Sequence, residues 1–286
     1  RTGGIGREVN TEFDSTKRED QTRSVIHKTF STTINLCLFH SPYHGRPLRR
    51  LGVKGVEIRK PEQLRTISSL IIPGGESTTM AKLAEYHNLF PALREFVQMG
   101  KPVWGTCAGL IFLADKATGQ KTGGQYLVGG LDCTVHRNFF GSQLQSFEAE
   151  LSVPDLASKE GGPETFRGIF IRAPAILEAG PEVQVLADYR VPSTRLSTSD
   201  SSIEDKTENA KEESKVIVAV RQGNLLGTAF HPELTADTRW HSYFLKMSNE
   251  IGEEASSSSL VPAQVSKSDH QQHRSDLPIF QPCNIN

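Results

Sequence analysis

The segment Gly105–Gly109 constrains the possible folds of this chain most. It has the sequence Gly-Thr-Cys-Ala-Gly, in which small residues surround a single cysteine. A strand-like run, Lys101–Trp104, precedes it, and a helix-like run, Leu110–Ala114, follows it. This order predicts a tight strand-to-helix turn that lifts the Cys107 side chain out of a sheet, the arrangement known as a nucleophile elbow. A thiol at the first turn of a helix ionises more readily, and the thiolate is the reactive form. Taken alone, the pattern also fits a buried structural cysteine.

A histidine and a glutamate, His231 and Glu233, follow a second strand-like run, Leu225–Phe230. Side chains two residues apart in an extended chain point to the same side, and Pro232 favours an extended His231. We therefore expect the Glu233 carboxylate to bind one imidazole nitrogen and to leave the other for a thiol. A base oriented by an acid is what nucleophilic catalysis requires. On its own, such a histidine is more often a surface or packed structural residue.

A glycine-rich loop, Pro73–Thr79, follows the buried-strand pattern Ser69–Ile72. Two adjacent glycines let the backbone come close to a ligand and turn its N–H groups toward it. Ordinary turn chemistry would explain this loop equally well if it stood alone. It stands one strand–helix unit before the cysteine elbow, so both loops are expected at the same edge of the sheet.

Five motifs of this chain resemble those of the class I (triad) glutamine amidotransferases. The closest resemblance is to the glutaminase subunits of pyridoxal 5′-phosphate synthase, the vitamin B6 biosynthesis family, and to its plant members in particular. The motifs occur in the family's order and are Pro73–Met80, Gly105–Leu110, His136–Gln143, Phe170–Pro174 and Phe230–Thr235. The resemblance covers roughly residues 48–247 and is highly specific.

The resemblance assigns roles to individual residues. It implies a catalytic triad with Cys107 as nucleophile and His231 and Glu233 as its relay. It implies that six residues bind the substrate: Gly75, Glu76, Ser77, Arg137, Ile171 and Arg172. Backbone N–H groups of Gly75 and Ala108 are expected to hold the developing oxyanion. Free glutamine carries a carboxylate and an ammonium group, so a pocket with arginine and an acceptor group suits it.

The same resemblance implies a function. The chain would hydrolyse L-glutamine to L-glutamate and ammonia through a Cys thioester, with no metal and no organic cofactor. The ammonia would pass to a separate synthase subunit of a hetero-oligomer, which builds pyridoxal 5′-phosphate. Two alternatives stay open: another Cys-His-Glu amidotransferase acting on a γ-glutamyl or amide substrate, and an inactive or weakly docking isoform.

Composition agrees with this interpretation. The chain has 286 residues, of which 36% are hydrophobic, enough for one sizeable core. Its net charge of −1 disfavours nucleic acid as a partner, and the lack of an apolar stretch of about 18 residues disfavours a membrane span. The four cysteines show neither metal-site nor disulfide spacing, and the start shows no signal sequence. We therefore expect a cytoplasmic protein.

Alternating strand and helix patterns predict an α/β fold with a mainly parallel central sheet, helices on both faces and disordered termini. We expect a glutaminase domain over residues 34–250, interrupted by a polar insertion at 192–215. A divergent segment, 1–33, precedes it, and a disordered tail, 251–286, follows it. Within the domain we expect a hairpin around Gly223 and helices that include Leu110–Lys116 and Thr238–Glu250.

The segment before Leu48 departs from the family pattern. Family members usually begin with a short strand, a loop and an amphipathic helix, and the run Ile34–Phe39 could supply the strand. The run His40–Pro47 contains two prolines and a glycine, which argues against the helix. Two explanations compete: an error in the assigned coding sequence upstream of Leu48, or a true isoform whose docking to the synthase is weakened.

Overall fold

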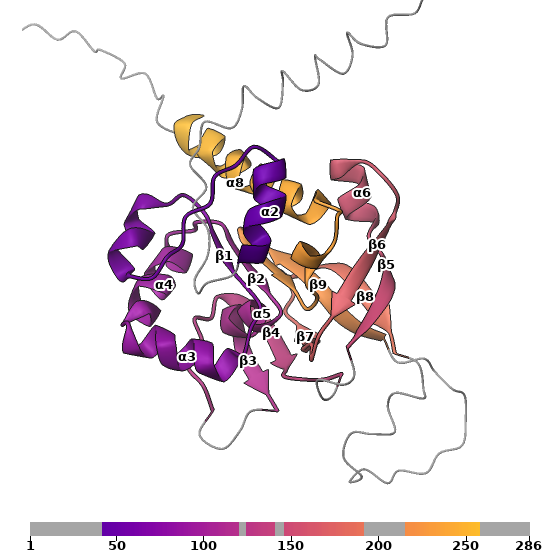
Figure 1. Ribbon diagram of the computed structural model, residues 1–286, viewed down its shortest axis with the longest axis horizontal. Helices are drawn as coiled ribbons and strands as arrows, with labels where there is room; N and C mark the ends of the chain where they lie inside the picture. Colours follow the sequence, from indigo (N-terminus) through magenta and orange to yellow (C-terminus); the bar gives the residue numbers. More distant parts are fainter. Residues whose placement is uncertain (1–41, 120–123, 141–145, 192–214, 258–286) are drawn as a thin grey trace, which may run out of the picture.

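The computed structural model describes residues 42–119, 124–140, 146–191 and 215–257, and its helices and strands form one α/β arrangement (Figure 1). The expectations for residues 1–33, for most of the polar insertion and for the end of the C-terminal tail lie outside these ranges. The helical elements are α2 (Pro42–Arg50), η1 (Pro61–Thr66), α3 (Ser77–Tyr86), α4 (Leu89–Gln98), α5 (Ala108–Leu113), α6 (Pro154–Glu160), η3 (Pro232–Leu234) and α8 (Arg239–Ser257).

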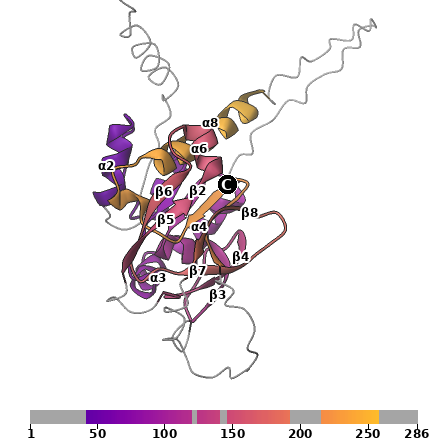
Figure 2. The ribbon, with the colours of Figure 1, turned by 90° about the vertical axis from the view of Figure 1, so that its right-hand side faces the viewer.

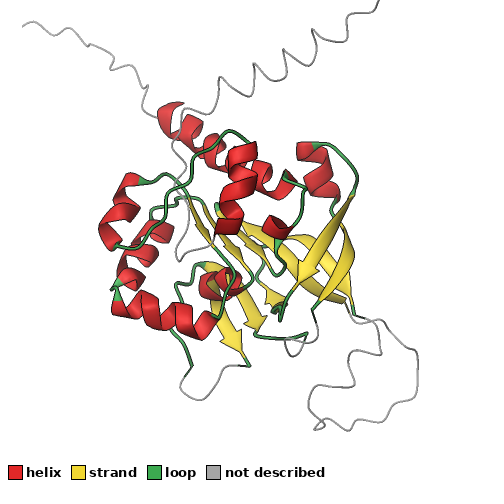
Figure 3. Cartoon of the chain, viewed as in Figure 1, coloured by secondary structure: helices red, strands yellow, loops and turns green. Residues whose placement is uncertain are grey.

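The described strands form a large central sheet and a small two-stranded sheet. The central sheet contains β1 (Leu70–Ile72), β2 (Val103–Thr106), β3 (Ala114–Thr118), β4 (Leu131–His136), β7 (Ala175–Ala179), β8 (Gln184–Arg190), β9 (Lys215–Gln222) and β10 (Leu225–Thr228). The small sheet pairs β5 (Phe147–Ser152) with β6 (Thr165–Phe170). Figure 3 shows most helices gathered beside and above the strands.

The central sheet follows the order β1-β2-β10-β9-β7-β4-β3, with β8 paired to β9. The α/β architecture is therefore confirmed, but the pairing is mixed rather than mainly parallel. Strands β1, β2 and β10 run parallel, as do β3 and β4, whereas β9 is antiparallel to β10, β7 and β8. The predicted hairpin explains part of this, because a tight turn at Gly223, whose φ is 53°, can join only antiparallel strands.

Helices cover both faces of the sheet at β2, as expected. Trp104 in this strand is fully buried, and its ring contacts His44 of α2 and Phe244 of α8. The next residue, Gly105, points the other way, and a side chain there would strike the backbone of α5 at Gly109. Helices α2 and α8 thus cover one face, and α5 covers the other. Figures 1 and 2 show α2 and α8 close together on the same side of the strands.

The N-terminal helix α2 corrects the sequence analysis, which argued against a helix over His40–Pro47. Three buried residues, His44, Pro47 and Leu48, follow the i, i+3, i+4 spacing of one helical face, while Arg46, Arg49 and Arg50 on the opposite side are exposed. Burial of that face outweighs the weak helix propensity of proline and glycine. The premise that the chain lacks the family's first helix is therefore wrong.

Two element boundaries also differ from expectation. The helix predicted over Leu110–Lys116 is α5, which ends at Leu113, and strand β3 begins directly at Ala114. The short helix is fully buried, so its apolar run fitted either helix or strand. The closing helix α8 extends to Ser257, beyond the predicted end at Glu250.

Candidate active site

Cys107 lies at the turn between β2 and α5, where the sequence predicts a nucleophile elbow. Its backbone has φ 50° and ψ −103°, a conformation that residues other than glycine rarely adopt. The Cys107 N–H donates to the Thr228 carbonyl at 2.7 Å, which holds the turn to β10. Such backbone strain costs on the order of 1–3 kcal/mol and typically occurs at functional sites. The elbow is confirmed.

Glycines allow the close approach of elbow and sheet. A Cβ added at Gly109 would overlap the carbonyl group of Ile72 in β1, and one added at Gly74 would overlap the His231 ring. The same added Cβ at Gly74 would lie 3.2 Å from the Cys107 Cβ. The loop after β1, the elbow and the histidine therefore meet at the carboxyl ends of the parallel strands, as the sequence predicts.

The predicted pairing of His231 with Glu233 is confirmed, since Nδ1 of His231 lies 2.8 Å from Oε1 of Glu233. The predicted reason for it is wrong. Glu233 lies in the 3-10 turn η3 rather than in extended chain, so the turn, not strand alternation, brings the carboxylate back to the ring. The His231 N–H donates to the Ile169 carbonyl at 2.8 Å, which fastens the histidine to β6.

Charges around His231 favour its protonated form. Burial alone would lower the pKa of His231, but the Cys107 thiolate, a side-chain hydrogen bond with Cys107 and the Glu233 carboxylate together raise it. Burial would raise the pKa of Glu233, yet its imidazole neighbours lower that pKa to about 2. The arrangement thus supports an imidazolium at His231 with an ionised carboxylate behind it.

A cleft of about 470 Å³ opens over Cys107 and His231. Its volume lies in the range typical of small-molecule sites. Nine of the residues predicted for the site line it: Gly75, Glu76, Ser77, Cys107, Ala108, Arg137, Ile171, Arg172 and His231. The tenth, Glu233, lies behind His231 with its side chain 4% exposed.

Glu76 and Arg137 form a polar wall of the cleft. Glu76 caps helix α3 by accepting the backbone N–H groups of Thr78 and Thr79. Burial tends to raise the pKa of Glu76, but hydrogen bonds from these threonines lower it to about 2. Arg137 donates to the hydroxyl oxygens of Ser77 at 2.6 Å and Thr78 at 3.1 Å, which connects the end of β4 to this loop.

Three of the four non-glycine residues with positive φ in the described chain line this cleft: Cys107, Asn138 and Arg172. Ile171 directs its carbonyl toward the thiol, with the oxygen 4.0 Å from the Cys107 sulfur. The sequence analysis did not predict Asn138, although it lies within one of the family motifs. The feature that marks Asn138 as a site residue is its positive φ of 53°, which is visible only in the structure.

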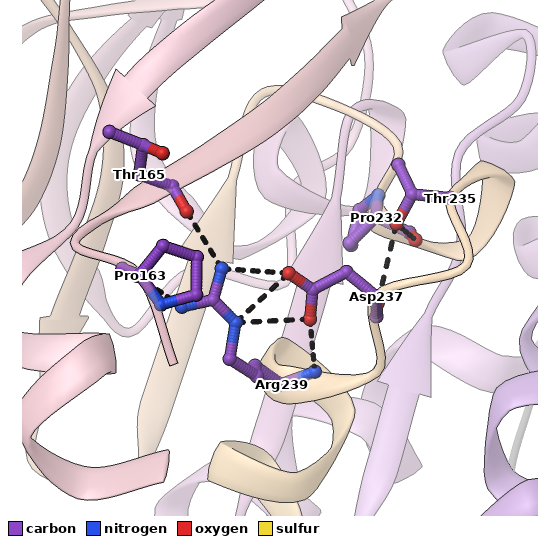
Figure 4. Close-up of polar contacts among 6 residues, drawn as sticks. All are labelled: Pro163, Thr165, Pro232, Thr235, Asp237 and Arg239. Atoms are coloured by element: carbon purple, nitrogen blue, oxygen red, sulfur yellow. Dashed lines mark hydrogen bonds and ion pairs between the residues drawn. The ribbon is translucent and has the colours of Figure 1, made fainter. Parts of the chain in front are cut away.

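A polar cluster holds the segment that follows Glu233 (Figure 4). The Arg239 guanidinium at the start of α8 forms an ion pair with Asp237 at 2.7 Å and donates to the Thr165 carbonyl of β6 at 2.7 Å. Thr235 donates its hydroxyl to the Pro232 carbonyl at 3.0 Å, which closes the turn η3. These contacts fix the position of the Glu233 turn relative to β6.

Among the described residues, no group of three or more His, Cys, Asp or Glu side chains is placed to hold a metal ion. The described helices also include none with the length and apolar character needed to cross a membrane. Cys133 is buried, and burial raises its pKa to about 12, so it contrasts with the elbow cysteine. Of the two described cysteines, only Cys107 faces the cleft.

Comparison with known proteins agrees with this geometry. The profile of the SNO glutamine amidotransferase family matches residues 41–250. The chain belongs to this family. The match begins one residue before α2, so it includes the helix that the sequence analysis did not expect.

Curated relatives of the chain carry a consistent name. It is 71% identical over 241 residues to a probable pyridoxal 5′-phosphate synthase subunit PDX2 of Arabidopsis thaliana, covering 83% of this chain and 94% of the relative. It is 45% identical over 210 residues to the pyridoxal 5′-phosphate synthase subunit PdxT of Pelotomaculum thermopropionicum, covering 73% and 91%. A crystal structure of a glutamine amidotransferase matches with a TM-score of 0.59 and 38% identity, covering 75% of this chain and 97% of the other.

Proposed function

We propose that this chain is the glutaminase subunit of pyridoxal 5′-phosphate synthase. It hydrolyses L-glutamine to L-glutamate and ammonia and delivers the ammonia to a separate synthase subunit for vitamin B6 biosynthesis. Membership of the SNO family and the names of the PDX2 and PdxT relatives support this function. The observation that carries it is the His231–Glu233 hydrogen bond, with His231 and Cys107 lining the same substrate-sized cleft.

The proposed reaction begins at Cys107. Its thiolate attacks the side-chain carboxamide carbon of glutamine, and the backbone N–H groups of Ala108 and Gly75 hold the oxyanion that develops. The His231 imidazolium donates its proton to the departing ammonia as the thioester forms. The neutral ring then takes a proton from water, which attacks the thioester and releases glutamate and the thiolate. Glu233 orients the ring and stabilises its charged form.

The remaining cleft residues suit the amino-acid end of glutamine. We propose that Arg137 and Arg172 bind the substrate carboxylate and that Glu76, ionised at neutral pH, interacts with its ammonium group. Gly75, Ser77 and Ile171 provide the adjoining loop surfaces. We also propose the cytoplasm as the compartment, supported by the two free cysteines of the described residues.

Two other candidate functions are less well supported. The inactive or weakly docking isoform rested on a disrupted first strand–helix unit; the helix of that unit, α2, is present and packed, whereas the strand candidate Ile34–Phe39 lies outside the described residues. A different amide substrate has no observation in its favour, because all the relatives named above are synthase subunits or glutamine amidotransferases.

A glutaminase assay tests the proposal. Glutamate release from glutamine is measured with and without the synthase subunit for the wild type, Cys107→Ala and Cys133→Ala. We expect Cys107→Ala to abolish hydrolysis and Cys133→Ala to retain it, since Cys133 is buried away from the cleft. Retained hydrolysis in Cys107→Ala would refute the nucleophile assignment, and no hydrolysis by the wild type with synthase would refute the function.

A further inference from the structure

Behind Glu233 lies a buried histidine, His44, that none of the family motifs contains. It comes from helix α2, about 190 residues before the glutamate in sequence, and it is 0% exposed. Its Nε2 lies 3.5 Å from Oε2 of Glu233, the carboxylate oxygen that does not face His231. That oxygen is buried and has no hydrogen bond among the described residues. Burying a carboxylate oxygen without a hydrogen-bond donor destabilises the fold, so an N–H of the facing imidazole would stabilise it.

Two further groups fix the orientation of the His44 ring. Its Nδ1 lies 3.1 Å from Nε2 of His241 in α8, and its Nε2 lies 3.2 Å from the Thr106 hydroxyl oxygen in β2. Trp104 packs against the edge of the ring. The titratable groups around His44 are thus Glu233, His231 and His241; burial and the charge of His231 lower the pKa of His44, and the Glu233 carboxylate raises it.

The positions of the ring protons on His44 and His241 follow from one buried nitrogen that has no partner. Nδ1 of His241 is buried and has no hydrogen-bond partner. A buried N–H without an acceptor costs more than a bare nitrogen, so we assign the His241 proton to Nε2, where it donates to Nδ1 of His44. A neutral His44 then carries its own proton on Nε2, which faces Glu233 and Thr106. Burial lowers the pKa of both histidines, consistent with two neutral rings.

We propose that His44 is a positioning residue for the Cys-His-Glu triad: its Nε2–H holds the Glu233 carboxylate from the side opposite His231, with His241 and Thr106 setting its orientation. The carboxylate is thereby held between two imidazoles, one that takes part in proton transfer and one that does not. His44 is not among the residues that line the cleft over Cys107, so its influence passes through Glu233. This inference deepens the proposed glutaminase function and rests on it.

The test replaces His44 by side chains of similar size that either lack or retain a hydrogen-bond donor. In His44→Leu the Nε2–H is lost, whereas in His44→Gln the side-chain amide can place an N–H near the same position. With synthase present, we expect roughly tenfold lower kcat for His44→Leu, since the buried Glu233 carboxylate loses the imidazole that faces its second oxygen. The KM for glutamine should stay unchanged, and His44→Gln should recover most of the rate.

A double-mutant cycle separates positioning from mere packing. If His44 acts through Glu233, His44→Leu should have little further effect in a Glu233→Gln background. An equal loss in both backgrounds would overturn the proposal, as would a wild-type kcat in His44→Leu. Leu48→Ala serves as the control, because it disturbs the same helix face without touching the network. It should lower stability and leave the pH profile of kcat/KM in place.

A second measurement does not need activity or a folded variant. Nitrogen NMR of histidine-labelled wild-type protein reports which ring nitrogen of His44 carries the proton between about pH 6 and 8. We expect the proton on Nε2 and a bare Nδ1. The opposite tautomer would overturn the positioning role even if glutamine hydrolysis is intact, and an inactive wild type would refute the function without affecting this result.

Discussion

Replacing Leu48 with alanine tests the helix that the sequence analysis did not expect. Leu48 is 0% exposed and lies on the buried face of α2, one turn after His44. Truncating a fully buried leucine typically costs about 2–5 kcal/mol, because the lost transfer free energy adds to that of the cavity left behind. For a domain of this size, such a loss lowers Tm by roughly 4–20 °C.

The assay is thermal and denaturant unfolding of the full chain, followed by circular dichroism and Trp fluorescence. Both tryptophans are buried, and Trp104 lies beneath α2, so its emission reports on the packing of this helix. If α2 were not packed on the sheet, Leu48 would be exposed and its truncation would change the free energy of unfolding by less than about 0.5 kcal/mol. That result would refute the reasoning.

Gly45→Ala is the matched variant on the same helix. A Cβ at Gly45 would meet only the tip of Arg49 at 3.5 Å, an ordinary contact. Alanine in place of glycine inside a helix should therefore raise the free energy of unfolding by about 0.5–1 kcal/mol. Opposite signs for Leu48→Ala and Gly45→Ala are expected only if α2 is both helical and packed.

Three more predictions concern the site and its scaffold. Gly109→Ala should destabilise the fold by about 1–3 kcal/mol, because the added methyl group overlaps the Ile72 carbonyl; an unchanged Tm would contradict this close approach. Gly74→Ala should lower the rate of glutamine hydrolysis with little change in Tm, because the methyl group displaces the His231 ring; a wild-type rate would count against it. Glu233→Gln should move the alkaline limb of kcat/KM to lower pH by about 1–2 units, because the carboxylate is one of the groups that raise the pKa of His231. The raised pKa of His231 and the lowered pKa of Glu233 mean that this pairing stabilises the fold fully between about pH 4.5 and 6.5. The stabilisation is lost as pH rises through the folded pKa of His231 or falls toward the folded pKa of Glu233, so the Tm difference between wild type and Glu233→Gln should be largest within this window. An alkaline limb of kcat/KM at the wild-type position in Glu233→Gln would contradict the electrostatic role of Glu233.

The local parts of this protein were predictable from its residues. The strand–Cys–helix turn at Cys107 and the hairpin at Gly223 depend on contacts within a few residues, so short patterns identify them. The triad and the cleft residues were identified through motif resemblance, because residues far apart in sequence show no spacing that would join them. His231 and Glu233 were paired correctly, but from a wrong backbone conformation.

Long-range packing settled the rest. Proline and glycine in α2 disfavour a helix locally, yet burial of Leu48 against the rest of the fold outweighs that preference. The same packing brings His44 to Glu233. No pattern in the sequence predicts this contact between α2 and η3. Sequence therefore specifies which short segments turn, pair or react. The burial of whole faces, which depends on segments distant in the chain, specifies which helix forms and what lies behind the triad.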